Sequence, residues 1–473
     1  VGMRAENGKI KNNSTGKISS TAEKATGMSQ SGNENLENEG TITLTGNQSV
    51  GMHSESVTAA GHQMINKGIV TVGHSATATS PSIGMYAANT DKTTIVNNGK
   101  VIAGNKSTGI YGGNITLNNN SETSAGNGGI GVYSKGGTVD IKENAKISVG
   151  DTLGDKQEGV GVYLAGNNQT LNSDTDNLTI GKGSFGYVMT GQGNTVRTGK
   201  AGTTRMINLT HSSIFMYSAD RTGTAVNYNN LRSTGDLNYG IYASGRVDNY
   251  GTIDFSQGIG NIGAYSYTKG ATTTPNSIRN YGTINVSKSD LQTNPDDRKY
   301  GIGMAAGYKS SDSGHVINSG IINVTGKDSI GLYASGKNST ATNKGTINLS
   351  GEKSVGMYLD NGATGINEGT ITTVGSPKGA KGVVLSNNSK LINKAGAKIN
   401  INSAEGFGIY RVNSEETNIT IANYGDITVS GTDAKVDGEF DPTGGKELEK
   451  TAGGVTLKAP RGTNDINITI NGK

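Results

Sequence analysis

Two short phrases alternate along this chain at a spacing of about 25 residues, and this internal repeat limits the possible folds more than any other feature. The clearest copies lie between Val316 and Thr373. One phrase is Asn-x-Gly followed by a strand with apolar residues at alternate positions, as in Asn343–Leu349. The other is Ser-(Val/Ile)-Gly-hydrophobic-Tyr, as in Ser354–Tyr358. A single copy cannot bury its apolar face, so copies must stack on one another.

Both phrases recur along most of the chain. The glycines of the second phrase are Gly2, Gly27, Gly51, Gly84, Gly109, Gly131, Gly161, Gly186, Gly240, Gly263, Gly303, Gly331, Gly356, Gly382 and Gly408, with Phe215 in one equivalent position and Gly454 as a weaker last member. The asparagines of the first phrase are Asn38, Asn66, Asn97, Asn249, Asn280, Asn318, Asn343, Asn367, Asn393 and Asn423. Between residues 98 and 248 only the glycine phrase persists, and we interpret that span as degenerate repeats.

Each repeat contains three short strand candidates, and no segment has a helical apolar period. The prediction is an all-β chain: one continuous parallel β-helix over residues 1–473, right-handed by the usual crossover preference, with about 17 rungs of about 25 residues. The apolar positions of the strands should line a narrow core. These residues are Ile42, Leu44, Ile253, Phe255, Ile284, Val286, Ile322, Val324, Ile347, Leu349, Ile427 and Val429.

Composition alone would favour disorder, since glycine contributes 74 residues and hydrophobic residues only 32%. The fixed positions of the apolar residues argue against it. Lys plus Arg (42) nearly balances Asp plus Glu (38), which gives no basic surface for nucleic acid. Cysteine is absent, and no apolar run is long enough for a membrane-spanning helix. No pattern indicates a cofactor or metal site, and we expect a monomer.

Three insertions interrupt the repeat, at residues 151–158, 287–300 and 431–450. Each lies between the Asn-phrase strand and the next glycine phrase, so all three should leave one corner of the coil. Neither terminus carries a visible cap, and we expect the sequence to be part of a longer rod.

The asparagine of the first phrase has two interpretations. Its amide could bind carbohydrate, or it could stack in a turn as an amide ladder, with the glycine two residues later adopting positive φ. The ladder is the favoured interpretation.

A tyrosine lies two residues after the glycine, or in one case after Phe215, in ten repeats, which accounts for ten of the 19 tyrosines. Residues beside the glycine, such as Val355 and Met357, should face inward, and the glycine and tyrosine should face outward. The phenols could bind sugars or a protein partner, or they could stack to stabilise neighbouring coils. If the strand bends at the glycine, the rings could face inward.

Candidate partner-binding residues are therefore the charged loop residues and the first tyrosines of the row. They are Asp296, Asp297, Arg298, Lys435, Asp437, Glu439, Asp441, Tyr86, Tyr111, Tyr133 and Tyr163. No catalytic residue is predicted, because the five histidines are dispersed and no triad context exists. The alternative is a polysaccharide-degrading lyase or hydrolase on the same fold, which requires acidic and basic groups to converge. A third possibility is a purely structural stalk.

The two phrases in succession, as in Asn343–Leu349 and Ser354–Tyr358, resemble the passenger regions of type V autotransporters. They are similar in particular to the very large fusobacterial outer-membrane adhesins of the RadD-like family. The resemblance implies a non-enzymatic passenger on the bacterial surface, with a membrane barrel elsewhere in the parent chain. It also implies binding to a host receptor or glycan, or to another bacterium. The matching positions are scaffold positions, so no binding residue is carried over.

Overall fold

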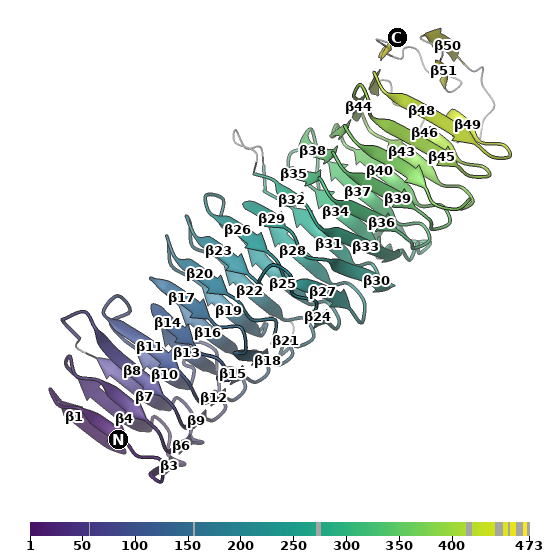
Figure 1. Ribbon diagram of the computed structural model, residues 1–473. Coiled ribbons are helices and arrows are strands. Elements are labelled where there is room, and N and C mark those ends of the chain that lie inside the picture. Colours follow the sequence, from purple (N-terminus) through teal and green to yellow (C-terminus); the bar gives the residue numbers. More distant parts are fainter. Residues whose placement is uncertain are drawn as a thin grey trace. The chain divides into compact units, whose positions relative to one another are not determined.

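A computed structural model describes residues 1–55, 57–154, 157–270, 276–412, 419–439, 448–452, 455–459 and 467–470, with the backbone alone from residue 436 on. The chain divides into two compact units, Val1–Asn230 and Leu231–Lys473. Within each unit, short strands stack coil upon coil (Figure 1). The predicted class is confirmed: the fold is an all-β parallel solenoid with almost no helix, three sheets along the coils and about 16 coils.

A coil consists of three strands that belong to three different sheets. In one coil of the second unit these are β37 (Ile330–Ser335), β38 (Asn338–Asn343) and β39 (Thr346–Leu349). The next coil begins with β40 (Val355–Asp360), which pairs in parallel with β37. We call the three sheets the tyrosine sheet, the asparagine sheet and the third sheet.

The first unit contributes nine strands to the tyrosine sheet: β1 (Met3–Glu6), β4 (Thr26–Ser31), β7 (Val50–Glu55), β10 (Ile83–Ala87), β13 (Thr108–Gly112), β16 (Ile130–Ser134), β19 (Val160–Leu164), β22 (Phe185–Met189) and β25 (Ile214–Ser218). Its asparagine sheet contains β2 (Ile10–Asn12), β5 (Leu36–Asn38), β8 (His62–Asn66), β11 (Thr93–Asn97), β14 (Asn114–Leu117), β17 (Thr138–Ile141), β20 (Thr170–Ser173), β23 (Thr195–Thr198) and β26 (Thr224–Asn227). Its third sheet contains β3 (Lys17–Ser20), β6 (Thr41–Leu44), β9 (Ile69–Val72), β12 (Lys100–Ala103), β15 (Glu122–Ala125), β18 (Lys146–Val149) and β21 (Leu178–Ile180), and β24 (Met206–Leu209) follows outside that ladder.

The second unit repeats the pattern. Besides β37 and β40, its tyrosine sheet contains β28 (Tyr239–Ala243), β31 (Ile262–Ser266), β34 (Ile302–Ala306), β43 (Lys381–Leu385), β46 (Phe407–Arg411) and β49 (Lys435–Glu439). Besides β38, its asparagine sheet contains β29 (Arg246–Asn249), β32 (Ile278–Asn280), β35 (Ser313–Asn318), β41 (Thr364–Asn367), β44 (Lys390–Asn393), β47 (Thr420–Asn423) and β52 (Asn467–Ile470). Besides β39, its third sheet contains β30 (Ile253–Ile259), β33 (Thr283–Lys288), β36 (Ile321–Val324), β42 (Thr370–Thr373), β45 (Lys398–Asn402) and β48 (Asp426–Ser430).

The remaining elements are few. Strand β27 (Asn230–Ser233) lies at the division between the units and pairs with β30 through Leu231. Strands β50 (Leu448–Ala452) and β51 (Val455–Ala459) form an antiparallel pair. A 3-10 turn, η1 (Pro295–Asp297), is the one helical element of the described residues. In that part of the chain no helix is long and apolar enough to cross a membrane.

The core follows the predicted alternation. Ten of the twelve predicted core residues are 0–1% exposed, for example Ile322 and Leu349 at 0%. Ile427 and Val429 of β48 differ, because both are only half-buried. Strand β48 is the last strand of its ladder among the described residues, so no described strand of this sheet covers these two side chains.

The asparagines form the predicted amide ladder. In the second unit, Asn318 Nδ2 donates to Asn343 Oδ1 at 3.0 Å, and Asn343 Nδ2 donates to Asn367 Oδ1 at 2.9 Å. The ladder runs from Asn249 to Asn423, and every member is buried. A shorter ladder in the first unit runs from Asn12 to Asn97. These bonds satisfy buried amides that would otherwise cost about 1–3 kcal/mol each.

The expected role of the glycine in the asparagine phrase is wrong. Gly345 and Gly369 do not have positive φ. A Cβ on Gly345 would instead collide with the carbonyl oxygen of Gly320 in the neighbouring coil. Glycine is therefore needed because the turns of neighbouring coils approach closely.

The expected orientation of the glycine phrase also needs correction. A Cβ on Gly356 would lie 2.5 Å from Ile371 Cγ2, so the glycine faces the core rather than solvent. Met357 is 0% exposed, as predicted, but Val355 packs with Tyr358 on the outer side of the sheet. The strand bends at the glycine, which brings two successive residues to the core, while the tyrosine rings remain partly exposed.

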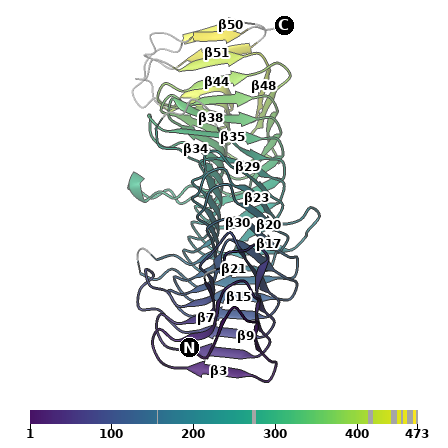
Figure 2. The ribbon, with the colours of Figure 1, turned by 90° about the vertical axis from the view of Figure 1, so that its left-hand side faces the viewer.

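Two insertions leave their coils at equivalent positions, between a strand of the third sheet and the next strand of the tyrosine sheet. Residues 151–154 and 157–158 lie between β18 and β19, with 155 and 156 outside the described residues, and residues 289–301 lie between β33 and β34. Antiparallel backbone hydrogen bonds between Asp290 and Lys299 hold the second insertion, and η1 lies at its tip, away from the coils (Figure 2).

The third predicted insertion differs from the expectation. Lys435–Glu439 forms β49, and Lys435 pairs with Phe407 of β46. These residues, and not the phrase around Gly454, therefore provide the strand of the tyrosine sheet that follows β46. The sequence pattern did not predict this strand, because charged residues occupy positions that are apolar in the other strands of the sheet.

Candidate functional site

In the first unit the predicted row of aromatic residues is a continuous ladder on the tyrosine sheet. Ring centroids lie 5.1 Å apart between Tyr86 and Tyr111, 5.1 Å between Tyr111 and Tyr133, and 5.0 Å between Tyr133 and Tyr163. His53 extends the ladder at 5.2 Å from Tyr86. The rings thus pack on their neighbours in stacked, tilted and edge-on arrangements, as expected for stabilising aromatic contacts. A role of these tyrosines in partner binding stays a prediction.

In the second unit the tyrosines line a groove of about 650 Å³, which we call the tyrosine groove. Its lining comes from β28, β31, β34, β37 and β40 and from the segments before and after β34. The lining residues are Tyr239, Tyr242, Ile262, Tyr265, Tyr267, Tyr300, Ile302, Ala305, Gly307, Tyr308, Ile330, Tyr333, Tyr358 and Asp360. A volume of this size is typical of ligand sites.

The groove lies where the row of tyrosines lacks one member. The parallel register aligns Tyr265 with Ala305, and Ala305 with Tyr333. Ala305 therefore occupies the tyrosine position of its coil. Ala305 packs with Ile302 and Ile330 in an apolar cluster against which Tyr265 and Tyr333 also pack. This cluster forms the floor of the groove.

The rim of the groove is more exposed than its floor. Tyr308 is 61% exposed and Tyr300 is 36% exposed, whereas Ala305 is 3% exposed. Tyr300 is the last residue of the predicted insertion 287–300, so this insertion contributes one side of the groove. Exposed tyrosines around an apolar floor are typical of binding surfaces, since each ring offers an apolar face and a polar tip.

Asp360 is the only charged residue among those that line the groove. Its Oδ1 accepts hydrogen bonds from the backbone N–H of Asn361 at 2.9 Å and from Asn387 Nδ2 at 2.6 Å, and its Oδ2 accepts from Asn361 Nδ2 at 3.2 Å. Within the described residues these donors are neutral amides, so no lysine or arginine balances the charge of the carboxylate.

Three partly buried phenols of the groove resist ionisation. Burial raises the pKa of Tyr333 to about 12, and the Asp360 carboxylate adds to the effect. Burial, followed by Asp360, also raises the pKa of Tyr358 well above its usual range. Burial, followed by the neighbouring phenols Tyr242 and Tyr239, does the same for Tyr265. The groove thus presents neutral hydroxyl groups and one negative charge.

The predicted charged residues lie apart from this lining. Asp296, Asp297 and Arg298 are exposed at η1, where Arg298 Nε donates to the carbonyl oxygen of Gln292 at 3.1 Å. Lys435 is exposed at the start of β49. Asp437 and Glu439 lie in β49, where only the backbone is described, and Asp441 lies outside the described residues. Binding by any of them stays a prediction.

Sequence reasoning missed most of the groove. Ala305 and Asp360 were not candidates, and Tyr300 and Tyr308 do not occupy the repeated tyrosine position. A signal was available: the phrase Gly303-Met304-Ala305 lacks its tyrosine, while a tyrosine stands on either side of it, at 300 and 308. The interrupted repeat, rather than the regular one, marks the site.

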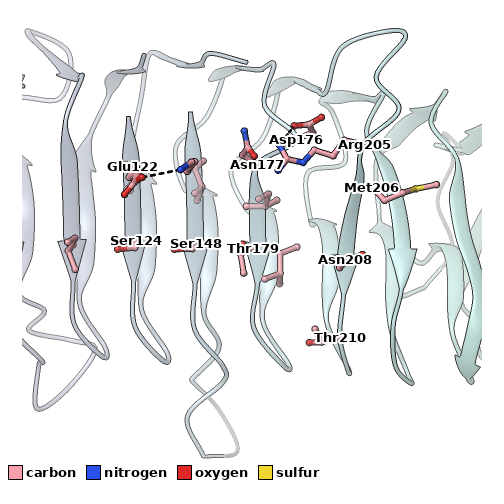
Figure 3. Close-up of a pocket in the computed structure, with 16 residues that line it drawn as sticks. Glu122, Ser124, Ser148, Asp176, Asn177, Thr179, Arg205, Met206, Asn208 and Thr210 are labelled. Carbon is pink, nitrogen blue, oxygen red and sulfur yellow. Dashed lines mark hydrogen bonds and ion pairs between the residues drawn. The ribbon is translucent and has the colours of Figure 1, made fainter. Parts of the chain in front are cut away.

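A second depression, of about 720 Å³, lies in the first unit over the outer face of the third sheet (Figure 3). Glu122 forms ion pairs with Lys100 at 2.9 Å and Lys146 at 3.2 Å, and Arg205 pairs with Asp176 at 3.3 Å. The two lysines lower the pKa of the Glu122 carboxyl group. Because these charges already pair with one another, the depression offers a weaker site than the tyrosine groove.

In the part of the chain that the structure describes, no group of three or more His, Asp or Glu side chains is placed to hold a metal ion. Coils of three short parallel strands, in constant register around a narrow core, define a protein of the parallel β-helix class.

Comparison with models of protein families identifies the family of the chain. Residues 110–370 match the model of the BigA third pectate lyase-like domain, and residues 3–106 match that of the BigA fourth domain. The first match covers more than half of the sequence, so the chain belongs to the family of the BigA third pectate lyase-like domain. BigA is an adhesin of the autotransporter type, and the chain is a bacterial autotransporter passenger-like protein. No curated protein and no solved structure matches. The closer resemblance to RadD-like adhesins stays a prediction.

Proposed function

We propose that this chain is the surface-displayed passenger of a bacterial adhesin, of the RadD-like type, and that it attaches to its partner through the tyrosine groove of the second unit. The partner is a host-cell receptor or glycan, or a surface component of another bacterium. The coils serve as a rigid scaffold, and the segments around β34 present the binding surface.

The groove is the observation that carries this proposal. It combines an apolar floor, exposed tyrosines at its rim and a carboxylate that forms no ion pair with a lysine or arginine of the described residues. Tyrosine is enriched among residues that dominate binding energy at protein surfaces. Within the groove, the row tyrosines Tyr333 and Tyr358 pack against one another, with ring centroids 5.8 Å apart. The rim residues Tyr300 and Tyr308 are free of that structural role because they lie outside the repeated position.

The experiment compares two double variants of the purified chain on beads, tested for attachment to a panel of host cells and bacteria. Tyr300→Ala with Tyr308→Ala removes the rim of the groove and should reduce attachment by about tenfold or more. The matched control is Tyr250→Ala with Tyr281→Ala, which removes an exposed stacked pair of the same unit, 4.8 Å apart and outside the groove. The control should attach like the wild type.

Two outcomes would contradict the proposal in different ways. Equal attachment of both double variants and the wild type would show that the groove does not bind. Failure of the wild-type chain to attach to any member of the panel would favour a stalk.

A further inference from the structure

A buried polar cluster interrupts the apolar core of the first unit, at the corner where the tyrosine sheet leads into the asparagine sheet. We call it the polar corner. Its members are Gln30 of β4, Ser54 of β7, His62 of β8 and Thr93 of β11, and none is more than 1% exposed. The parallel register places Gln30 beside Ser54 and His62 beside Thr93. Three successive coils therefore contribute to the polar corner.

Hydroxyl groups hold His62 in this corner. Its Nε2 lies 2.7 Å from Ser54 Oγ, and that Oγ lies 3.5 Å from Thr93 Oγ1. Its Nδ1 is buried and has no hydrogen-bond partner among the described residues. The same holds for the oxygen and the nitrogen of the Gln30 side-chain amide. The polar corner thus contains buried polar atoms without partners, which weakens the coils at this point.

The fold does not require a histidine at this position. His62 lies four residues before the ladder asparagine of its coil, and Thr93 occupies the same position in the next coil. The corresponding residues in four coils of the second unit are Gly314, Ser339, Ala363 and Ser389. Small side chains that carry no charge near neutral pH can therefore close the corner.

No charged group is in place to balance a proton on His62. The titratable groups on the elements packed against it are Glu34, Glu37, His53, Glu55, Asp91 and Lys92. Among the described residues none of these groups forms an ion pair or a hydrogen bond with the His62 ring. Glu34 acts on the ring through its backbone carbonyl group. A proton on His62 would therefore be a buried charge without a counter-ion.

Protonation would also change the hydrogen bonding of the corner. A neutral imidazole has one N–H donor, which Ser54 Oγ can accept, whereas the protonated ring has two. Burial accordingly lowers the pKa of His62, and the backbone carbonyl groups of Glu34 and Asn33 oppose this shift. The folded chain thus binds the proton less readily than the unfolded chain. The stabilising contribution is complete above about pH 7 and is lost as the pH falls below about 6.5.

We propose that the polar corner is an acid-sensitive element of the first unit: protonation of His62 disrupts the corner and loosens the coils that contain β4, β7, β8 and β11. This inference goes beyond the proposed function, because it gives the chain a response to the acidity of its surroundings. His53 of the same coil is less suited to this role. It stacks on Tyr86 at 5.2 Å, and the Glu55 carboxylate favours its protonated form.

The experiment measures amide hydrogen exchange of the purified chain at about pH 7 and about pH 5 by mass spectrometry, corrected for the direct effect of pH on exchange. Protection of β7, β8 and β11 should fall about tenfold at the lower pH, because one proton taken up on opening shifts the opening equilibrium by up to about tenfold per pH unit. The segment from β13 to β20 contains no histidine, so it is the internal reference and should keep its protection.

Two variants assign the effect to His62. His62→Gln keeps a side chain that can bond to Ser54 but does not titrate, so it should retain its protection at about pH 5. If this variant fails to fold, His62→Thr takes its place, since it copies Thr93 of the neighbouring coil. The control is His74→Gln, which changes an exposed histidine between β9 and β10. It should lose protection at about pH 5 as the wild type does.

Each contrary result overturns the inference. Unchanged protection of the wild type at about pH 5 would show that the corner tolerates the charge, as would follow if Glu34 turned to pair with the ring. An equal loss in His62→Gln and the wild type would assign the response to another group, and His53→Gln would test the histidine of the same coil. An equal loss from β13 to β20 would indicate a general effect of acid. None of these results bears on attachment through the tyrosine groove.

Discussion

The aromatic ladder of the first unit and the tyrosine groove of the second are built from the same repeat, yet one is closed and the other is open. From Tyr86 to Tyr163 every coil supplies a tyrosine, and each ring covers the next at about 5 Å. Between Tyr265 and Tyr333 the coil supplies Ala305 instead. At Ala305, the replacement of the repeated tyrosine by a small residue thus accompanies a groove where the coils of the first unit form a stabilising stack.

The surroundings of the two regions differ as well. The charged neighbour of the ladder is Lys135, which lies near Tyr86 and Tyr133, whereas that of the groove is Asp360. The asparagine ladder of the second unit continues to Asn423, but in the first unit Leu117 takes the position after Asn97. Buried amides therefore support the coils of the groove, and apolar contacts support most of the coils of the ladder.

The largest expected effect comes from breaking the amide ladder behind the groove. Asn343→Ala removes the shortest of the hydrogen bonds that Asn318 Nδ2 donates and the side-chain donor to Asn367 Oδ1, and both asparagines are buried. We expect a loss of about 3–5 kcal/mol in the free energy of unfolding. Urea denaturation, with hydrogen exchange to locate the affected coils, measures this loss.

The matched control is Asn323→Ala, which interrupts a half-buried amide row where water can replace the bonds. An equal cost for the two variants would contradict the assigned role of the buried ladder.

A smaller effect is expected from opening the aromatic ladder of the first unit. Tyr111→Ala removes two ring contacts at 5.1 Å and should reduce the free energy of unfolding by about 2–3 kcal/mol. It also creates a gap like that at Ala305, but beside Lys135. Urea denaturation of this variant measures the loss. An unchanged free energy of unfolding would contradict a stabilising role of these ring contacts.

The smallest effect concerns alkaline pH. Tyr333 has a pKa of about 12 in the folded chain, above the value of about 10 expected when unfolded. The folded state thus holds the Tyr333 proton more tightly than the unfolded state. The contribution of Tyr333 to the free energy of unfolding is therefore complete below about pH 10, and it is lost as the pH rises from about 10 through 12. Tyr333→Phe should flatten the fall of the unfolding midpoint over this range. A fall equal to that of the wild type would show that Tyr333 does not titrate late.

The sequence was sufficient to predict the fold because the scaffold residues are repeated. The repeat is visible in the alternating Ile322 and Val324, in the buried asparagines and in the glycines at which the strands bend. The direction in which Gly356 faces was nevertheless predicted wrongly. The groove depends instead on residues that occur once. Tyr308 and Asp360 become neighbours of Tyr333 only after the coils stack, and the absence of a side chain at Ala305 has meaning only beside filled positions. The repeat pattern describes the features that all coils share, so it gives no information about a site that depends on a single coil.

The constant register has a consequence for how such a gene can change. Asn318, Asn343 and Asn367 occupy the same place in three successive coils and bond to one another. If recombination between repeats removes or adds one whole coil, each new neighbour presents the same partner, and the ladder closes again. Chain length can therefore vary in steps of one repeat without a new folding problem, while a single substitution like that at position 305 can move or erase the groove.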